Sequence, residues 1–437
     1  MLIFIGGHFV MNAITPKNNL SSYDLNIDIK ETFLDKTKTW MMKDKTSKLV
    51  HIKFVFKNTG HAFEQKQGSL SVLDNMIFEG AGALDAYHFQ EFLSNNQVHL
   101  TFSFGPDDNE ISIQTPPKNL NIALKALTLI FENLRLDPDE FKRAKEQLLL
   151  NLEQSKLEPT SLASDHFNKY AFKKHPYFDS IENKIIHIKA ITPEDVKNAL
   201  KQHFTSDRLS CVVLGNFDET AAESFIQSVK TLLQSTSILP TSLPPLEFQN
   251  TGKKKYFFMD VPQSVILFRT TAIPVDHPDF HALQLFNTIL GASSFSSRLW
   301  FNIRESKGLA YNIGTALFVM RYASMLKGRM GTSTYQVEDA LKILETTIKD
   351  TVEKGVTQKE LDHQKQFVMG SFLTSFDSLG EMSRVLSTYI TDLSLEGLKN
   401  RNKKIQALTL KEVNDAGKKH IKCEDLTFCI LGNHKVD

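Results

Sequence analysis

The stretch 191–217, ITPEDVKNALKQHFTSDRLSCVVLGNF, aligns without a gap on the stretch 408–434, LTLKEVNDAGKKHIKCEDLTFCILGNH, at an offset of 217 residues. Both contain Leu-Gly-Asn at the same place, and a threonine, a valine and a histidine also match. The pentapeptides ALKAL from Ala123 and ALKIL from Ala340 repeat at the same offset. Because one offset relates two separate windows, the sequence predicts two copies of one domain.

A proline-rich segment separates the two copies. Residues 235–255, STSILPTSLPPLEFQNTGKKK, contain three prolines and show no helical or strand periodicity, which is typical of an extended linker. We place the boundary near residue 245. We therefore expect an N-terminal domain over residues 23–234 and a homologous C-terminal domain over residues 256–437, preceded by an extension or degenerate signal at residues 1–22.

Each copy mixes strand-like and helix-like segments. The run VHIKFVF at residues 50–56 is rich in β-branched and aromatic side chains, and CVVLGN and FCILGN at the ends of the repeats also predict strands. Thr192, followed by proline and acidic residues, is typical of a helix start, and the same chemistry recurs at Asp137 and Thr409. The sequence therefore predicts an α+β fold of two tandem homologous domains, each a mostly antiparallel sheet packed with helices.

Composition excludes several classes of function. The chain has 51 Lys and Arg residues against 50 Asp and Glu, so its net charge of +1 provides no field that would attract nucleic acid or an anionic membrane. No run approaches the roughly 18 apolar residues that span a bilayer. The three cysteines include no CxxC pair, and their odd number cannot close into a full disulfide framework.

The N-terminus leaves the cellular location open. MLIFIGGHFVMNA is apolar enough for an export signal, but it lacks a basic first region and an A-x-A cleavage site. If Met11 is the true start, no signal remains. No HExxH, GxSxG or phosphate-binding GxxxxGK[ST] pattern occurs, which argues against the common hydrolases and nucleotide enzymes.

Two pairs of residues that contain histidine have spacings found in metal sites. His88 and Glu91 are three residues apart, and His277 and His281 are four apart, so each pair would share one face of a helix. Both pairs lack the remaining ligands of a complete site. We interpret the first as part of an amphipathic helix and the second as a helix start with exposed imidazoles.

Residues 68–82, GSLSVLDNMIFEGAG, resemble the zinc-binding helix of the insulinase/pitrilysin metallopeptidases, approximately G-L-A-H-F-L-E-H-M-x-F-x-G. On that pattern the first histidine ligand falls on Ser71, the catalytic glutamate on Asp74 and the second histidine on Asn75. A hydroxyl and a neutral amide are poor zinc ligands, and the aspartate is one methylene shorter than the family's general base.

The resemblance implies a third ligand, a glutamate, from a later helix. In the corresponding stretch, FKRAKEQLLLNLEQS, Glu146 and Glu153 are nearby, and the pattern assigns neither. Because one carboxylate cannot hold zinc alone, we expect no metal bound by this chain and a zinc ion in a partner subunit.

Residues 290–311, LGASSFSSRLWFNIRESKGLAY, are similar to a second family pattern, L-G-x-x-x-F-S-S-R-L-x-x-x-I-R-E-x-x-G-L-A-Y. Here Arg304 and Tyr311 occupy the family's paired arginine and tyrosine. The resemblance implies that they face a zinc site across a chamber, bind substrate backbone and stabilise the oxyanion. The alternative is that Arg304 pairs with a surface carboxylate and Tyr311 is a core aromatic.

This combination resembles the zinc-free subunits of bacterial two-subunit members of the family. It implies a heterodimer in which the chain forms half of a clam-shell chamber around an extended or unfolded peptide, with a homologous zinc-bearing subunit as partner. Two alternatives stay open: a non-enzymatic assembly or peptide-binding protein of the same fold, and an active peptidase whose divergent metal site uses His88 and Glu91. The resemblance suggests the periplasm, and the N-terminus leaves the cytoplasm as an alternative.

Overall fold

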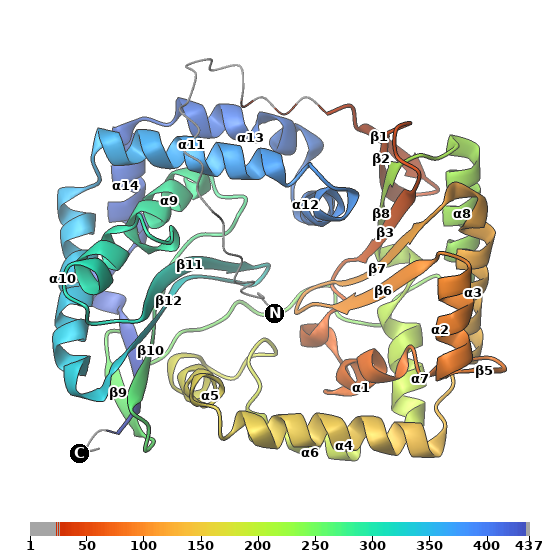
Figure 1. Ribbon diagram of the computed structural model, residues 1–437, viewed down its shortest axis with the longest axis horizontal. Helices are drawn as coiled ribbons and strands as arrows, with labels where there is room; N and C mark the ends of the chain where they lie inside the picture. The colour runs from red at the N-terminus through yellow and green to blue at the C-terminus, as the bar shows by residue number, and fades with distance from the viewer. Residues whose placement is uncertain (1–22, 24, 26, 434–437) are drawn as a thin grey trace.

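The computed structural model describes residues 23, 25 and 27–433 of the chain. The extension or signal predicted at residues 1–22 lies outside these residues. Within the described ranges, no helix is both long and apolar enough to cross a bilayer. Two halves lie side by side, each built around one β-sheet (Figure 1).

The two sheets share one topology, except that the N-terminal sheet has an additional edge strand, β1. The N-terminal sheet has the order β1-β2-β8-β3-β7-β6, and the C-terminal sheet has the order β11-β12-β10-β13-β9. The β2–β8 and β9–β13 pairs are parallel, and the other pairings between these described strands are antiparallel. The strands β8 and β13, predicted from CVVLGN and FCILGN, thus occupy matching places, which confirms the predicted α+β fold with its duplicated, mostly antiparallel sheet.

The strand bounds follow in chain order. They are β1 (Lys30–Leu34), β2 (Thr37–Lys43), β3 (Val50–Phe56), β4 (Gly80–Ala81), β5 (Leu84–Asp85), β6 (His99–Phe104), β7 (Asn109–Thr115), β8 (Leu209–Gly215), β9 (Lys254–Phe258), β10 (Gln263–Thr271), β11 (Asn312–Met320), β12 (Ala323–Ser333) and β13 (Thr427–Gly432). The short strands β4 and β5 pair only with each other among the described strands.

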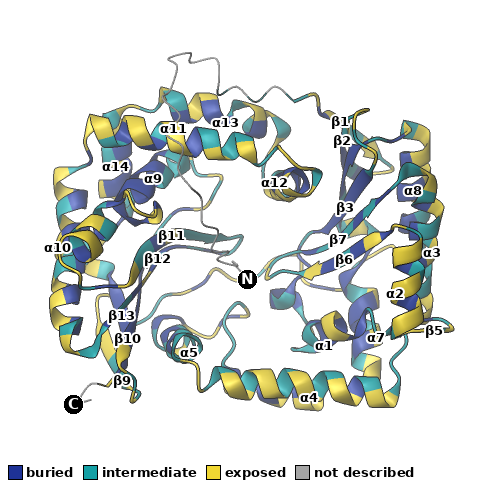
Figure 2. Ribbon diagram, in the orientation of Figure 1, coloured by how far each residue is buried: buried dark blue, intermediate teal, exposed yellow. Residues whose placement is uncertain are grey.

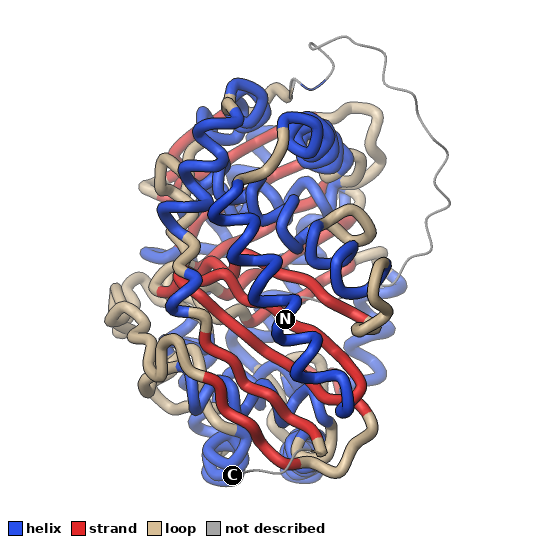
Figure 3. The backbone as a smooth tube through the Cα atoms, turned by 90° about the vertical axis from the view of Figure 1, so that its left-hand side faces the viewer, coloured by secondary structure: helices blue, strands red, loops and turns tan. Residues whose placement is uncertain are grey.

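Helices pack around both sheets, as the side view in Figure 3 shows. In the N-terminal half they are α1 (Ser69–Met76), α2 (Ala86–Asn95), α3 (Leu120–Asn133), α4 (Pro138–Ser155), α5 (Pro159–Ala171), α6 (Ile181–Ala190), α7 (Pro193–His203) and α8 (Glu219–Leu232). In the C-terminal half they are α9 (Phe280–Asn287), α10 (Val337–Lys354), α11 (Gln358–Thr374), α12 (Leu379–Asp392), α13 (Leu395–Ala407) and α14 (Leu410–His420).

The predicted helix starts have the expected chemistry at two of three places. At α7, Thr192 Oγ1 accepts the N–H of Asp195 and the Asp195 carboxylate accepts the N–H of Thr192, which is a capping box. The equivalent box, built on Thr409, begins α14. Helix α4 starts at Pro138 as predicted, but Asp137 does not cap it, because its carboxylate instead accepts a hydrogen bond from Arg135 Nε at 2.8 Å.

Each half contributes one helix that packs on the sheet of the other half. Helix α12 packs on the N-terminal sheet, where Leu386 and Ile390 join a buried cluster with Trp40 of β2. Reciprocally, α5 packs on the C-terminal sheet, where Phe167 contacts the cluster around Leu267 of β10. The central strands are therefore covered on both faces, as the fully buried runs β3 and β13 show (Figure 2). Apolar burial couples the two halves to each other.

Candidate functional site

The zinc-motif positions lie on α1, and Glu64 holds the first turn of this helix. Glu64 Oε1 accepts the backbone N–H of Leu70 at 2.6 Å, and Oε2 accepts that of Gly68 at 3.3 Å. Gly68 has a φ of +92°, and a Cβ there would lie 3.1 Å from the Ile188 side chain, so the position favours glycine. The negative charge of Glu64 is also stabilised by the helix N-terminus, so the start of α1 is well fixed.

The three zinc-motif positions do not form a metal-binding set. Asp74 and Asn75 are exposed and Ser71 is half-buried. The Asn75 amide donates to the backbone oxygen of Ser71 at 2.9 Å, so it is used inside the helix. Desolvation raises the pKa of Asp74, against the opposing effect of His61. The hydroxyl and amide are not ligands that zinc prefers, and the residues present do not fit a zinc ion.

Helix α4, which contacts α1, adds no ligand to this set. Glu146 lies 3.9 Å from Lys142, and both side chains are exposed. Glu153 lies 2.8 Å from Lys156 and is also exposed. The α4 side chains that pack against the N-terminal core include Leu148, Leu149 and Leu152. The face of α4 turned toward the core is therefore apolar.

His88 lies on an amphipathic helix, α2, as predicted. Its Nδ1 lies 2.8 Å from Asp85 Oδ1. In the part of the chain that the structure describes, one group of three potential ligands lies close enough to share an ion, and it contains neither His88 nor Glu91. The geometry gives no support to the divergent metal site considered from the sequence.

The second histidine pair differs from its prediction. His277 and His281 are half-buried, not exposed, because α13 and α14 pack against this part of the chain. Helix α9 begins only at Phe280, after His277. The His277 ring lies 5.1 Å from the ring of His420, at the end of α14. The sequence spacing therefore paired His277 with the wrong histidine.

Arg304 and Tyr311 lie on either side of the turn that leads into β11. Arg304 lies in the last turn of a π-helical segment, Trp300–Glu305, and its exposed side chain makes no ion pair or side-chain hydrogen bond with any residue that the structure describes. Tyr311 is 72% exposed, and its backbone N–H donates to Gly331 at 3.0 Å. The arginine is thus not tied to a surface carboxylate of the described chain, and the tyrosine is not a core aromatic.

Arg298, in the same motif, has a structural role. Its Nε and Nη2 donate to the two carboxylate oxygens of Glu360 at 2.7 and 2.8 Å, and Nη1 donates to the backbone oxygen of Gly355 at 3.0 Å. These bonds attach the segment 290–311 to the start of α11. Phe295 and Phe301 of the same segment are 69% and 57% exposed. The segment 290–311, which Arg298 anchors, thus has several large exposed side chains.

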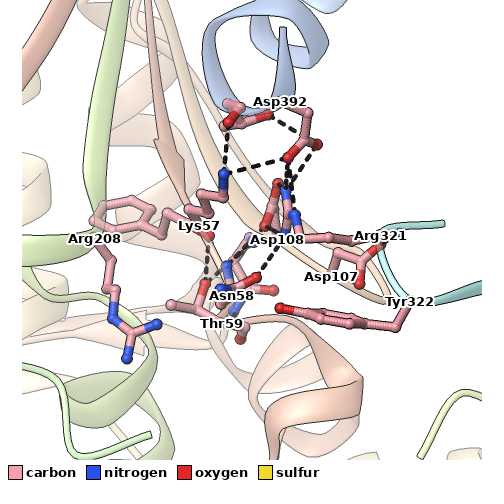
Figure 4. Close-up of polar contacts among 12 residues, drawn as sticks. Lys57, Asn58, Thr59, Asp107, Asp108, Arg208, Arg321, Tyr322 and Asp392 are labelled. Atoms are coloured by element: carbon pink, nitrogen blue, oxygen red, sulfur yellow. Dashed lines mark hydrogen bonds and ion pairs between the residues drawn. The ribbon is translucent and has the colours of Figure 1, made fainter. Parts of the chain in front are cut away.

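Strand β11, which begins directly after Tyr311, and strand β6 are edge strands among the strands that the structure describes. The turns that follow these two strands touch at the centre of Figure 1. At the contact, Arg321 of the β11–β12 turn binds Asp108 of the β6–β7 turn and Asp392 at the end of α12 (Figure 4). We call Arg321, Asn58, Asp107, Asp108 and Asp392 the Arg321 cluster. Unpaired edge strands are able to accept an extended peptide as an added strand.

Comparison with known families agrees with this arrangement. The family description "Insulinase (Peptidase family M16)" matches residues 40–184, and "Peptidase M16 inactive domain" matches residues 190–368. The chain belongs to the insulinase, or M16, peptidase family. Within the M16 fold, the first match contains α1 with its altered zinc motif, and the second contains Arg304 and Tyr311.

Known M16 proteins resemble the chain over most of its length. "Non-peptidase homolog YmxG" of Helicobacter pylori is 25% identical over 88% of this chain and 89% of its own. "Uncharacterized zinc protease YmxG" of Bacillus subtilis is 23% identical over 74% of this chain and 78% of its own. The crystal structure of a peptidase M16 inactive domain from Pseudomonas fluorescens has a TM-score of 0.86 at 22% identity and covers 94% of this chain and 100% of that one. The last likeness supports the M16 fold.

The sequence contains no pattern that identifies Arg321, His420 or Glu64 as functional or structural contacts. Arg321 is one of many basic residues, and its partners lie 213 and 71 residues away. His420 matches His203 in the repeat, which marks it as part of a duplicated element and not as a neighbour of His277. Glu64 precedes the recognisable motif by four residues and resembles an ordinary surface acid in the sequence.

Proposed function

We propose that the chain is the non-catalytic subunit of a heterodimeric zinc peptidase. Arg304 and Tyr311 would act on a peptide held at a zinc site of a homologous partner. The observation that carries the proposal is the contrast between the two motifs. The zinc motif on α1 has lost both histidine ligands, whereas the arginine and tyrosine are exposed and anchored through Arg298.

The chemistry of these two side chains suits a hydrolytic transition state. A guanidinium and a phenol both donate hydrogen bonds, and such donors stabilise the oxyanion that forms when water attacks a peptide carbonyl. Because the Arg304 guanidinium has no partner among the described residues, its donors are available to substrate. Zinc, bound by the partner, would activate the attacking water.

The substrate of this site would be an extended peptide. The edge strands β6 and β11 have backbone groups that an added strand can pair with, and pairing through the main chain gives broad specificity. The exposed Phe295 and Phe301 near Arg304 fit contact with another molecule, either the partner or the peptide.

A second candidate is a peptide-binding protein without any peptidase partner. It is favoured by the name of the Helicobacter pylori relative, "Non-peptidase homolog", and by the same free strand edges. Purification of the tagged chain from its own cells, with identification of stoichiometric companions, separates the two. A homologous companion with an intact HxxEH motif supports the heterodimer, whereas a stable complex without one supports the second candidate.

A further inference from the structure

A histidine–aspartate–histidine cluster lies in the half of the molecule opposite to α1. His277 precedes α9, Asp279 is the N-cap residue of α9, and His420 is the last residue of α14. One potential ligand atom from each residue lies within 4.8 Å of the atoms from the other two. Helices α9 and α14 pack closely, so two rigid elements hold the three side chains together.

The polar contacts of the cluster are well defined. His420 Nε2 donates to Asp279 Oδ2 at 2.7 Å, and Lys419 Nζ donates to the same oxygen at 3.0 Å. His277 Nδ1 accepts the backbone N–H of Asp279 at 3.0 Å. The His420 side chain is 10% exposed and that of Asp279 is 34% exposed, so one side of the cluster is open to solvent. An ion and a water ligand can enter from that side.

We propose that His277, Asp279 and His420 form a binding site for a divalent transition-metal ion such as Zn²⁺. Two imidazoles and one carboxylate are ligands that zinc prefers, with water in the fourth position. Ligands about 2.0 to 2.2 Å from a tetrahedral zinc ion lie roughly 3.3 Å apart. Rotamer changes must therefore widen the 2.7 Å between His420 Nε2 and Asp279 Oδ2 and adjust the His277 ring. Nothing in the M16 zinc motif on α1 takes part.

Binding has three local costs that predict moderate affinity. His420 must give up the hydrogen bond from its Nε2 to Asp279 when that nitrogen binds the ion. His277 must release the N–H of Asp279, whichever nitrogen binds: Nδ1 would use its lone pair for the metal, and if Nε2 binds, a neutral ring carries its proton on Nδ1. Lys419 must leave the carboxylate, and its side chain is 65% exposed and free to do so. The ion in turn fixes the end of α14 to the start of α9 and stabilises the fold by mass action.

The proposed site gives a second possible origin for any zinc that is measured in the purified chain. Zinc bound to the isolated chain would come from the cluster and not from a peptidase centre. A His277→Asn variant separates the two sources, because zinc that remains in the variant belongs elsewhere. The proposal of a heterodimer and the proposal of this metal site can therefore be tested separately.

The test is equilibrium dialysis of the full chain against Zn²⁺, with metal content measured for wild type and four variants. We expect one zinc per chain in wild type, and affinity lowered by at least about 100-fold in His277→Asn and His420→Asn, since losing a ligand costs more than the roughly 10- to 100-fold of an outer-shell partner. Lys419→Met should bind more tightly. His88→Asn, a matched control from an exposed His–Asp pair without a second histidine, should bind as wild type does. Equal binding by wild type and His277→Asn would overturn the proposal.

Discussion

Arg321 and Asp108 form a two-bond ion pair between the halves of the molecule, with Nη1–Oδ1 at 2.8 Å and Nη2–Oδ2 at 2.9 Å (Figure 4). The same guanidinium binds Asp392, and its Nη1 also donates to Asn58. Arg321 is only 13% exposed, so water screens these bonds weakly. Arg321, together with the packing of α5 and α12 on the opposite sheets, therefore fixes the relative position of edge strands β6 and β11.

Arg321→Ala should lower the free energy of unfolding by about 3 kcal/mol, because it leaves Asp108 without its cation in partly buried surroundings and Asp392 with only Lys57, at 3.4 Å. Denaturant unfolding measures the change. The control is Arg384→Ala, whose pair with Glu381 is well exposed and should contribute less than about 1 kcal/mol. If both variants are equally stable, the Arg321 cluster does not hold the halves together.

Leu386→Ala should destabilise the N-terminal sheet, although Leu386 belongs to the C-terminal half. The side chain is fully buried in the cluster that α12 forms with this sheet, and removing such a leucine costs about 2 to 5 kcal/mol. Hydrogen exchange of β3 and β8 should accelerate. Leu150→Ala, at a site 51% exposed on α4, should change little. Unchanged exchange in β3 and β8 would argue against coupling through α12.

The Arg298–Glu360 pair should make stability depend on pH. Desolvation alone would raise the pKa of Glu360, but hydrogen bonds from Arg298 and Thr357 outweigh it and hold this pKa at about 2, below its ordinary 4.5. Because the folded pKa is the lower one, the stabilisation is present above about pH 4.5 and is lost as the pH falls toward 2.

Glu360→Gln should therefore be less stable than wild type by about 2 to 3 kcal/mol at pH 6, and the gap should narrow below about pH 4.5 and become small only near pH 2. Denaturant unfolding across this pH range measures the gap. Glu412→Gln is the matched control, since Glu412 has the same capping position on α14 but is fully exposed and has no arginine. A gap that does not change with pH would contradict the assignment.

Arg304→Ala should lower turnover by the heterodimer about 100-fold or more, the scale of losing one oxyanion donor, without changing the fold or the association of subunits. Tyr311→Phe should reduce turnover while keeping the aromatic ring. Lys307→Ala removes a positive charge from the same turn, but this side chain lies beside α10, so turnover should stay normal. Sedimentation analysis checks that each complex is intact. Normal turnover in Arg304→Ala would exclude the proposed role.

The sequence predicts the local features of the fold well. The 217-residue repeat locates the matching strands β8 and β13, and capping chemistry locates the starts of α7 and α14. These features depend on neighbouring residues and on patterns of alternation, which one sequence displays.

The features that join distant parts of the chain are not predictable in this way. The sequences of α5 and α12 have ordinary amphipathic patterns. Such a pattern does not indicate which of the two sheets the helix packs on, because the same apolar face would be buried against either. Asp108 and Arg321 lie 213 residues apart, and no spacing rule connects them. The pairing of His277 with His420 likewise depends on how α9 packs against α14, so a search for nearby histidines selects His281 instead.

The most direct test of the account is a peptidase assay on the purified chain, alone and mixed with a homologous subunit that carries HxxEH. We expect that the chain alone is inert, that the mixture cleaves extended peptides, and that Arg304→Ala abolishes most of the gain. Cleavage by the chain alone would contradict it, since Ser71 and Asn75 would then belong to a working site.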